Sequence, residues 1–217
     1  MRSYFIKTPG FIMRFFSKYT WRLPVNSNEI FLTFDDGPTP EITEFVLSEL
    51  KKYNAKATFF CIGKNIKKQS NTFNKIISEG HAIGNHTQNH LQGWKTNNQK
   101  YLKSVLECEN IIANWPQKVN NSKLFRPPYG KIRKSQARNL LKNGYKIIMW
   151  DVLSGDFDSS ISNERCLQNV LKNTRNGSII VLHDNKKFKH LTLNALMPII
   201  KGLKKKGFAM EAIPFNL

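Results

Sequence analysis

Residues 29–38 of the 217-residue chain read EIFLTFDDGP, an apolar run that ends abruptly in two acids, a glycine and a proline. The uninterrupted run over residues 30–34 is typical of a short strand buried inside a parallel sheet. Asp35 and Asp36 therefore stand at the end of a predicted strand. On its own, an Asp-Asp-Gly-Pro sequence indicates only a turn, because each of these residues favours turns. Its meaning depends on what the rest of the chain brings beside it.

The rest of the chain alternates between short apolar runs and helical patterns. Besides residues 30–34, the apolar runs predict strands over residues 57–62, 82–83, 124–125, 145–152, 178–182 and 208–213. Apolar periodicity and glycine breakers predict helices over residues 40–52, 71–78, 97–114, 135–143, 163–173 and 191–205. This alternation is typical of parallel βα units, arranged either as a doubly wound sheet or as a small, incomplete (β/α) barrel. No repeat or linker interrupts residues 29–217, so we expect one domain after an N-terminal arm, residues 1–28.

The composition is that of an ordinary globular protein with an unusually basic charge. Hydrophobic residues make up 40% of the chain and charged residues 23%. The 34 Lys and Arg against 15 Asp and Glu give a net charge of +19, which attracts anionic polymers or an anionic membrane surface. The basic residues are spread along the whole chain without a zinc-finger, leucine-zipper or aromatic RNA-binding signature, so no specific nucleic-acid partner is predicted. Three cysteines without a CxxC pair predict no disulfide framework.

The N-terminal arm is basic and aromatic. Its apolar runs are too short for the core of a secretory signal or for a membrane-spanning helix, so we expect a cytoplasmic protein or one at the cytoplasmic membrane surface. The arm could lie on a membrane with Phe11, Ile12, Phe15 and Phe16 inserted. The alternative, which we favour, is an arm that packs on the domain.

Polar side chains follow several of the predicted strands, at the point where each strand ends. They are Asp35, Asp36, His86, His90, Arg126, Asp156, His183 and Asp184. In a parallel barrel the carboxyl ends of all strands share one face, so these side chains are expected to meet in one cleft. One carboxylate and two imidazoles form a set typical of a catalytic zinc site that keeps a position open for water.

The two aspartates and the two histidines each form a pair with a characteristic spacing in the sequence. Two adjacent aspartates at a strand end point in different directions, so one can bind a metal while the other stays beside it. His86 and His90 are four residues apart, the spacing that brings two imidazoles onto one face of a helix. Such a pair alone is more often a solvated helix face than a metal site, and residues 126–130 alone are a rigid loop. The shared position at strand ends is what favours a functional site.

Five motifs, in this order, resemble those of the polysaccharide deacetylases, carbohydrate esterase family four, also called the chitooligosaccharide deacetylase homology domain. They are TFDDGP at 33–38, HTQNH at 86–90, RPPYG at 126–130, DVLSGDF at 151–157 and IVLH at 180–183. Two motifs depart from the family pattern. The fourth commonly ends in Asp-Trp, where this chain has Asp156 and Phe157, and in the fifth the leucine and the histidine are adjacent. The resemblance covers residues 29–213.

With this resemblance we expect an α/β fold that forms a distorted, incomplete (β/α) barrel of about seven parallel strands. Residues 29–217 would be the catalytic domain. The resemblance implies that Asp36, His86 and His90 hold one divalent transition metal, with zinc expected and cobalt or nickel as alternatives.

The resemblance also implies the acid and base of the reaction. Asp35 would be the general base that takes a proton from water, and Arg126 would orient it. His183 would be the general acid that protonates the leaving amine, and Asp156 would raise its pKa.

The remaining residues that the resemblance assigns would contact the substrate. The backbone N–H of Tyr129 would stabilise the oxyanion, and Leu182 would line the pocket for the acetyl methyl group. Pro127 and Phe157 complete this set, in which Phe157 keeps an apolar wall without the indole N–H of tryptophan.

The predicted reaction is hydrolysis of an N-acetyl amide in an N-acetylhexosamine-containing glycan, which releases acetate. The partner is therefore an N-acetylated glycan, and the positive charge favours an anionic one. Three points stay open at this stage. Asp151 or Asp158 could replace Asp156 as the partner of His183, the substrate could be an O-acetyl ester or a non-sugar amide, and the domain could bind glycans without catalysis.

Overall fold

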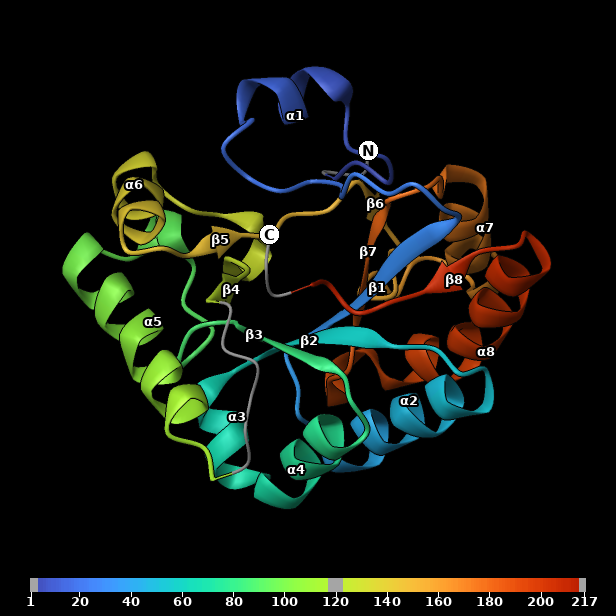
Figure 1. Cartoon of the computed structure of the whole chain (residues 1–217), viewed down its shortest axis with the longest axis horizontal. Helices are drawn as coiled ribbons and strands as arrows, with labels where there is room; N and C mark the ends of the chain where they lie inside the picture. Colours follow the sequence, from blue (N-terminus) through green and yellow to red (C-terminus); the bar gives the residue numbers. More distant parts are fainter. Residues whose placement is uncertain (1–3, 117–122, 215–217) are drawn as a thin grey trace.

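The computed structural model describes residues 4–116 and 123–214. Within them, eight strands form one sheet that curls into an open barrel, and helices surround it (Figure 1). The strand order is β5-β4-β3-β2-β1-β7-β6, and β8 pairs with β1 outside this path. All of these pairings are parallel. The predicted fold, an incomplete (β/α) barrel of about seven parallel strands, is confirmed.

The elements have the following bounds. The strands are β1 (Glu29–Asp35), β2 (Ala57–Cys61), β3 (Ala82–Asn85), β4 (Leu124–Phe125), β5 (Lys146–Ile147), β6 (Val152–Leu153), β7 (Ile179–His183) and β8 (Ala209–Met210). The α-helices are α1 (Gly10–Phe15), α2 (Pro40–Lys52), α3 (Gly63–Lys68), α4 (Ser70–Ser78), α5 (Asn98–Ala113), α6 (Lys134–Lys142), α7 (Asn163–Asn173) and α8 (Lys189–Lys205). Three short 3-10 helices are η1 (Gly93–Lys95), η2 (Pro128–Gly130) and η3 (Lys186–Phe188).

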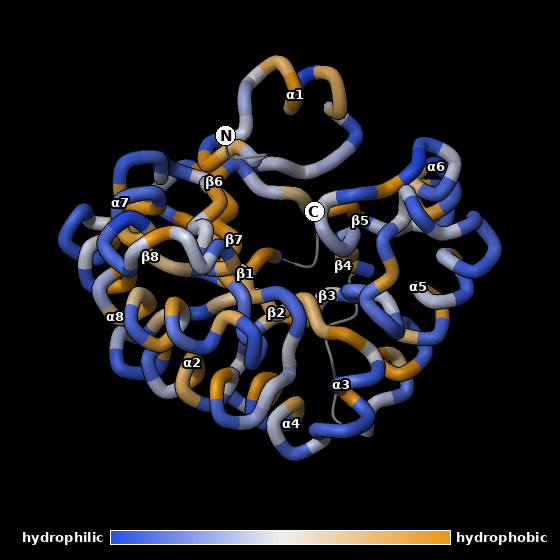
Figure 2. The backbone as a smooth tube through the Cα atoms, turned by 180° about the vertical axis from the view of Figure 1, so that it is seen from behind, coloured by the Kyte–Doolittle hydropathy of each residue, from blue (hydrophilic) through white to orange (hydrophobic). Residues whose placement is uncertain are grey.

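Strand β1 lies inside the sheet, between β2 and β7, and separates two apolar layers. Ile30, Leu32 and Phe34 belong to the large core that the strands share with the helices. Because side chains alternate along a strand, Phe31 points the other way and packs in the small core inside the barrel. The same alternation puts Asp35 on the inner side, at the carboxyl end. Figure 2 shows hydrophobic residues along the strands and mixed hydrophobic and hydrophilic residues along the surrounding helices.

The single strand predicted over residues 145–152 is wrong. The structure divides it into β5 and β6, which lie at opposite edges of the sheet. The N–H of Ile148 still donates to the O of Phe125 in β4, whereas the N–H of Asp151 donates to the O of Ile179 in β7. An apolar run does not reveal where the chain changes its pairing partner, because apolar residues continue on both sides of the change. Helix α3 was not predicted either, since its six residues are mostly polar.

The N-terminal arm lies across the opening between β5 and β6. Thr20 N bonds to the O of Ile147 at 2.9 Å, and Leu153 N bonds to the O of Ile6 at 2.9 Å. Leu23 N bonds to the O of Gly177 at 2.9 Å. Figure 1 shows this segment, with α1, above the gap between α6 and α7. The described part of the arm therefore fills the place where a complete barrel would have another strand.

The arm does not bury all of its aromatic residues. Of the four residues that a membrane-bound arrangement would insert, Phe11 and Phe15 are exposed, whereas Ile12 and Phe16 are half-buried. None of the helices in the described ranges is long and apolar enough to span a membrane. Contact between this arm and a membrane stays a prediction.

A buried acid ties the arm to the barrel, and we expect its loss to destabilise the protein. Asp151 is fully buried and lies 2.7 Å from Lys7 Nζ, while its carboxylate also accepts the N–H of Ile179 at 3.1 Å. Removing one partner of a buried ion pair lowers the free energy of unfolding by roughly 3–5 kcal/mol. For Asp151→Ala we expect a loss at the lower end of this range, because Lys7 is partly exposed. Urea unfolding measures this loss. The control is Glu44→Ala, which removes an exposed pair with Lys75 and should cost less than about 1 kcal/mol; equal losses would contradict the prediction.

Candidate active site

The structure brings the predicted polar residues together at the carboxyl ends of the strands. Asp35 ends β1, the His86–His90 loop follows β3, Arg126 follows β4, and His183 ends β7. The described contacts join these residues into three groups: Asp36 with two histidines, Asp35 with Arg126, and His183 with an acid that follows β6.

The first group has the composition of a metal site. One ligand atom from each of Asp36, His86 and His90 lies within 4.8 Å of the others. Asp36 Oδ1 is 3.0 Å from Nε2 of His90 and 3.5 Å from Nε2 of His86. This oxygen is buried and has no hydrogen-bond partner among the described residues. A divalent cation would satisfy it together with the two imidazoles, so the three residues fit a three-ligand site with an open position.

Electrostatics keep Asp36 in the form that such a site needs. Burial alone would raise the pKa of Asp36, but the close approach of the His86 and His90 imidazoles to its carboxylate holds this pKa well below its usual range. The carboxylate is therefore ionised at neutral pH. His86 is oriented from behind, because its Nδ1 lies 2.8 Å from the O of Arg126, which leaves Nε2 to face Asp36.

The expectation that His86 and His90 share a helical face is wrong. Residues 86–90 form a loop after β3, and Thr87 and His90 have φ angles of 65° and 54°, in the left-handed region. Side-chain bonds hold the loop: Asn85 Oδ1 accepts the N–H of Thr87, and Thr87 Oγ1 accepts the N–H of Leu91. The imidazole rings still meet, at 5.1 Å between centroids. A spacing of four residues does not distinguish a helix from a compact loop.

Two residues that follow β7 support this site and were given no role from the sequence. Asn185 Nδ2 donates to Asp36 Oδ2, and its Oδ1 accepts the N–H groups of Lys187 and Phe188. Asp184 accepts the N–H of Gly37 at 2.9 Å, and a Cβ at Gly37 would lie only 2.1 Å from Asp184 Oδ2. Only glycine fits there. Asp184 follows the predicted strand over residues 178–182, whereas no pattern in the sequence indicates the contact of Asn185 with Asp36.

We expect Asn185→Ala to weaken metal binding about 10–100-fold, because Asp36 would lose the donor that orients it. Competition with a chromophoric chelator measures the dissociation constant. Asn194→Ala, an exposed amide on α8, is the matched control and should bind metal as the wild type does. An unchanged dissociation constant in Asn185→Ala would show that the contact does not tune the site.

The second group fixes Asp35. Arg126 is fully buried, and its Nη1 donates to Asp35 Oδ1 at 2.7 Å and to Thr33 Oγ1 at 2.6 Å. Its Nε and Nη2 donate to the carbonyl oxygens of Ile148 and Met149. The guanidinium is thus held from several sides and keeps a positive charge against one carboxylate oxygen. The other oxygen of Asp35 has no side-chain donor among the described residues.

The third group pairs His183 with Asp156. His183 Nδ1 is 2.8 Å from Asp156 Oδ1, which also accepts from Ser154 Oγ at 2.9 Å. Asp151 binds the N-terminal arm, and Asp158 accepts from Ser160, so neither competes for the histidine. Burial alone would lower the pKa of His183, but the charge and hydrogen bond of Asp156 raise this pKa to about 9. The imidazole is therefore protonated at neutral pH.

The predicted position of Leu182 is wrong. Leu182 pairs in register with Phe34 and lies in the core between strands and helices, on the face of the sheet opposite to His183. Val181 pairs with Thr33 and shares the inner face with His183. In the family motif one residue separates the leucine from the histidine, and Val181 is the residue of this chain at that position.

The other substrate-contacting candidates lie around the site. Tyr129 is 60% exposed, has a φ of 61°, and its ring is 4.6 Å from that of His90. Phe157 contacts His183 edge to face at 5.6 Å between centroids. Pro127 is buried and its O accepts the N–H of Gly130, so it shapes the loop rather than presenting a surface.

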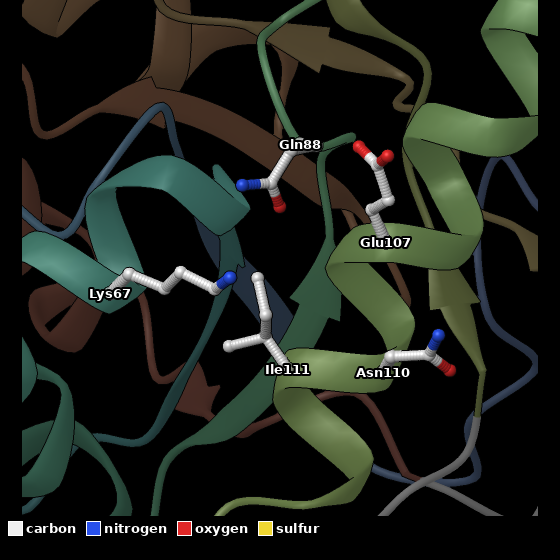
Figure 3. Close-up of a pocket in the computed structure, with 5 residues that line it drawn as sticks. All are labelled: Lys67, Gln88, Glu107, Asn110 and Ile111. Atoms are coloured by element: carbon white, nitrogen blue, oxygen red, sulfur yellow. The ribbon is translucent and has the colours of Figure 1, made fainter.

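A separate hollow of about 560 Å³ lies on the outside of the barrel, between α3 and α5 (Figure 3). Its lining residues are Lys67, Gln88, Glu107, Asn110 and Ile111. Gln88 belongs to the loop that carries both histidines, but the hollow is lined by none of the three metal-ligand candidates. The chemistry therefore belongs to the carboxyl ends of the strands.

Comparison with known proteins agrees with this geometry. The family described as polysaccharide deacetylase matches residues 22–148. A peptidoglycan-N-acetylglucosamine deacetylase of Bacillus cereus is 35% identical over 195 residues, which cover 89% of this chain and 90% of that protein. A chitooligosaccharide deacetylase of Azorhizobium caulinodans is 32% identical over 89% of this chain and 96% of that protein. A crystal structure of a peptidoglycan N-acetylglucosamine deacetylase superposes with a TM-score of 0.84 at 35% identity, covering 94% of both chains.

Proposed function

Because this chain belongs to the polysaccharide deacetylase family, we propose that it hydrolyses the acetamide bond of N-acetylglucosamine units in peptidoglycan. As a member of that family it is a metal-dependent hydrolase. The observation that carries the proposal is the meeting of three groups at one end of the barrel: Asp36 with two imidazoles, a carboxylate fixed by arginine, and a charged histidine. The names of the similar proteins and the net charge of +19 support an anionic N-acetylated glycan such as peptidoglycan.

Asp36, His86 and His90 would hold one divalent transition metal, and we propose zinc. When bound, such an ion lowers the pKa of water and polarises a carbonyl group. The oxygen and nitrogen donors of the three side chains suit zinc, and cobalt and nickel accept the same donor set.

The side chains around this centre divide the proton transfers between them. Asp35, oriented by Arg126, accepts the proton of the attacking water. The backbone N–H of Tyr129 donates a hydrogen bond to the acetyl oxygen as negative charge develops there. His183 Nδ1 is held by Asp156, so Nε2 is the atom that donates a proton to the departing sugar nitrogen. The C–N bond then breaks, and acetate and a free amine leave.

Acetate release from three substrate classes tests the proposal. Purified protein is incubated with peptidoglycan fragments, chitooligosaccharides and an O-acetylated xylan, with and without a chelator. We expect acetate from the peptidoglycan fragments, loss of this activity with chelator, and recovery on adding zinc. Acetate from the ester alone would identify an esterase. No acetate from zinc-loaded protein would favour a glycan-binding role without catalysis.

The dependence of kcat on pH should reflect the protonation of His183. The general acid must carry a proton, and the raised pKa of about 9 keeps it charged up to that pH. A divalent cation beside Asp36 lowers this pKa, so we expect kcat to fall on the alkaline side between the ordinary value of 6.5 and about 9. Asp156→Asn removes the carboxylate that raises the pKa, and should move this limb to lower pH. Asp158→Asn is the control, and a limb that moves equally in both variants would refute the assignment.

A further inference from the structure

A second hollow, of about 610 Å³, opens beside His183 at the carboxyl end of the barrel. The loop after β6 and the segment from η3 into α8 form its walls. Phe157 and Phe188 each contact His183 edge to face, at 5.6 and 5.3 Å between centroids, and both line the hollow. Its size lies in the range of small-molecule sites, and the two rings place it directly next to the proposed general acid.

The wall of this hollow combines apolar and polar groups in the way that a sugar ring requires. Ile161 and Leu191 add to the aromatic surface, which suits the C–H face of a ring. Asn163 also lines the hollow, and its Oδ1 is buried without a hydrogen-bond partner among the described residues. A buried acceptor of this kind matches the hydroxyl or amide donor of a bound sugar.

The wall of this hollow carries one lysine without an acidic partner among the described residues. Lys187 lines it, lies over the ring of Phe188 at 5.4 Å, and has no acid within ion-pair distance in the described part of the chain. The neighbouring Lys189 differs, because it pairs with Glu41 at 2.8 Å. Asp156 is the acid that lines the hollow, and its carboxylate is already engaged by His183. An incoming carboxylate would therefore meet an uncompensated ammonium group.

We propose that this hollow binds the sugar unit next to the one that is deacetylated, and that Lys187 favours a unit that carries a carboxylate. The inference rests on the proposed function and adds to it the residue that recognises the charge of the glycan. It assigns the two contacts separately: Asn163 recognises the sugar itself, and Lys187 recognises its charge.

Two matched substrates test this assignment. One is a peptidoglycan tetrasaccharide with free lactyl carboxylates, and the other is the same tetrasaccharide with these groups converted to neutral amides. Lys187→Ala should raise KM for the acidic substrate about fivefold, which corresponds to the free energy of one exposed charge contact. Its kcat and its KM for the neutral substrate should stay unchanged. Lys187→Arg should restore the preference. Lys204→Ala, exposed at the far end of α8, is the control for net charge.

Asn163→Ala provides the second test. It should raise KM for both substrates by the same factor, because the sugar ring is common to them. A loss in Lys187→Ala that is equal for both substrates would mean that the lysine only supports Phe188, and no change with either substrate would overturn the site. If zinc-loaded wild-type protein releases acetate from neither, the proposed function fails. Calorimetric binding of the two tetrasaccharides to wild type and Lys187→Ala then decides the inference, which equal affinities would overturn.

Discussion

Asp35→Asn is expected to lower kcat by about 10²–10⁴-fold while the metal content stays that of the wild type. The amide has nearly the shape of the carboxylate but does not accept a proton from water. Its oxygen can still accept the bond that Arg126 makes to Asp35 Oδ1 at 2.7 Å. The variant therefore separates loss of the base from loss of the site.

Two controls distinguish loss of the general base from loss of the folded protein. Arg126 is fully buried, so loss of its counter-charge should also lower the free energy of unfolding, by up to about 3–5 kcal/mol. Circular dichroism at the assay temperature shows whether the variant is folded. Glu44→Gln removes an exposed carboxylate and should keep full activity. Wild-type turnover in folded Asp35→Asn would exclude Asp35 as the base.

His86→Ala should abolish both metal binding and acetate release. Removing this ligand leaves Asp36 and His90, and two donors do not hold a catalytic ion at stoichiometric zinc. We expect the metal content, measured by mass spectrometry, to fall to a trace and acetate release to fall to the chelator-treated background. Stoichiometric metal in the variant would remove His86 from the proposed site.

His81→Ala is the matched control for this loss. His81 is also buried, but it lies at the amino ends of β2 and β3, where its Nδ1 accepts the N–H of Ala57. Burial and the charge of Lys56 lower its pKa to about 4, so it is neutral and structural. This variant should lose stability and keep its zinc.

The parts of the fold that could be predicted are those in which one physical signal dominates. Strand β1 was predicted because its apolar run is continuous, and the side chains after it were expected to converge because parallel strands share their carboxyl ends. Helix α2 was predicted with its bounds, since Pro40 suits the first helical position. These features depend on local sequence and on one rule of topology.

The predictions that are wrong concern features that depend on contacts between residues far apart in the sequence. The run over residues 145–152 changes its neighbour from β4 to β7, and apolar residues continue on both sides of that change. The family resemblance assigns Leu182 to the acetyl pocket, whereas the pairing of β7 with β1 decides which face of the sheet this residue occupies. The contact of Asn185 with Asp36 joins residues 149 positions apart in the sequence, and no sequence spacing predicts it.

The arm that lies across the opening of the barrel has a consequence for the order of events during protein synthesis. Residues 4–28 leave the ribosome long before their partners at 147–153 and at 177–178. More than half of the chain separates Thr20 from Ile148, so this pairing cannot form early and is entropically costly to close. We expect the arm to dock only after the helices and strands that separate it from these partners have assembled.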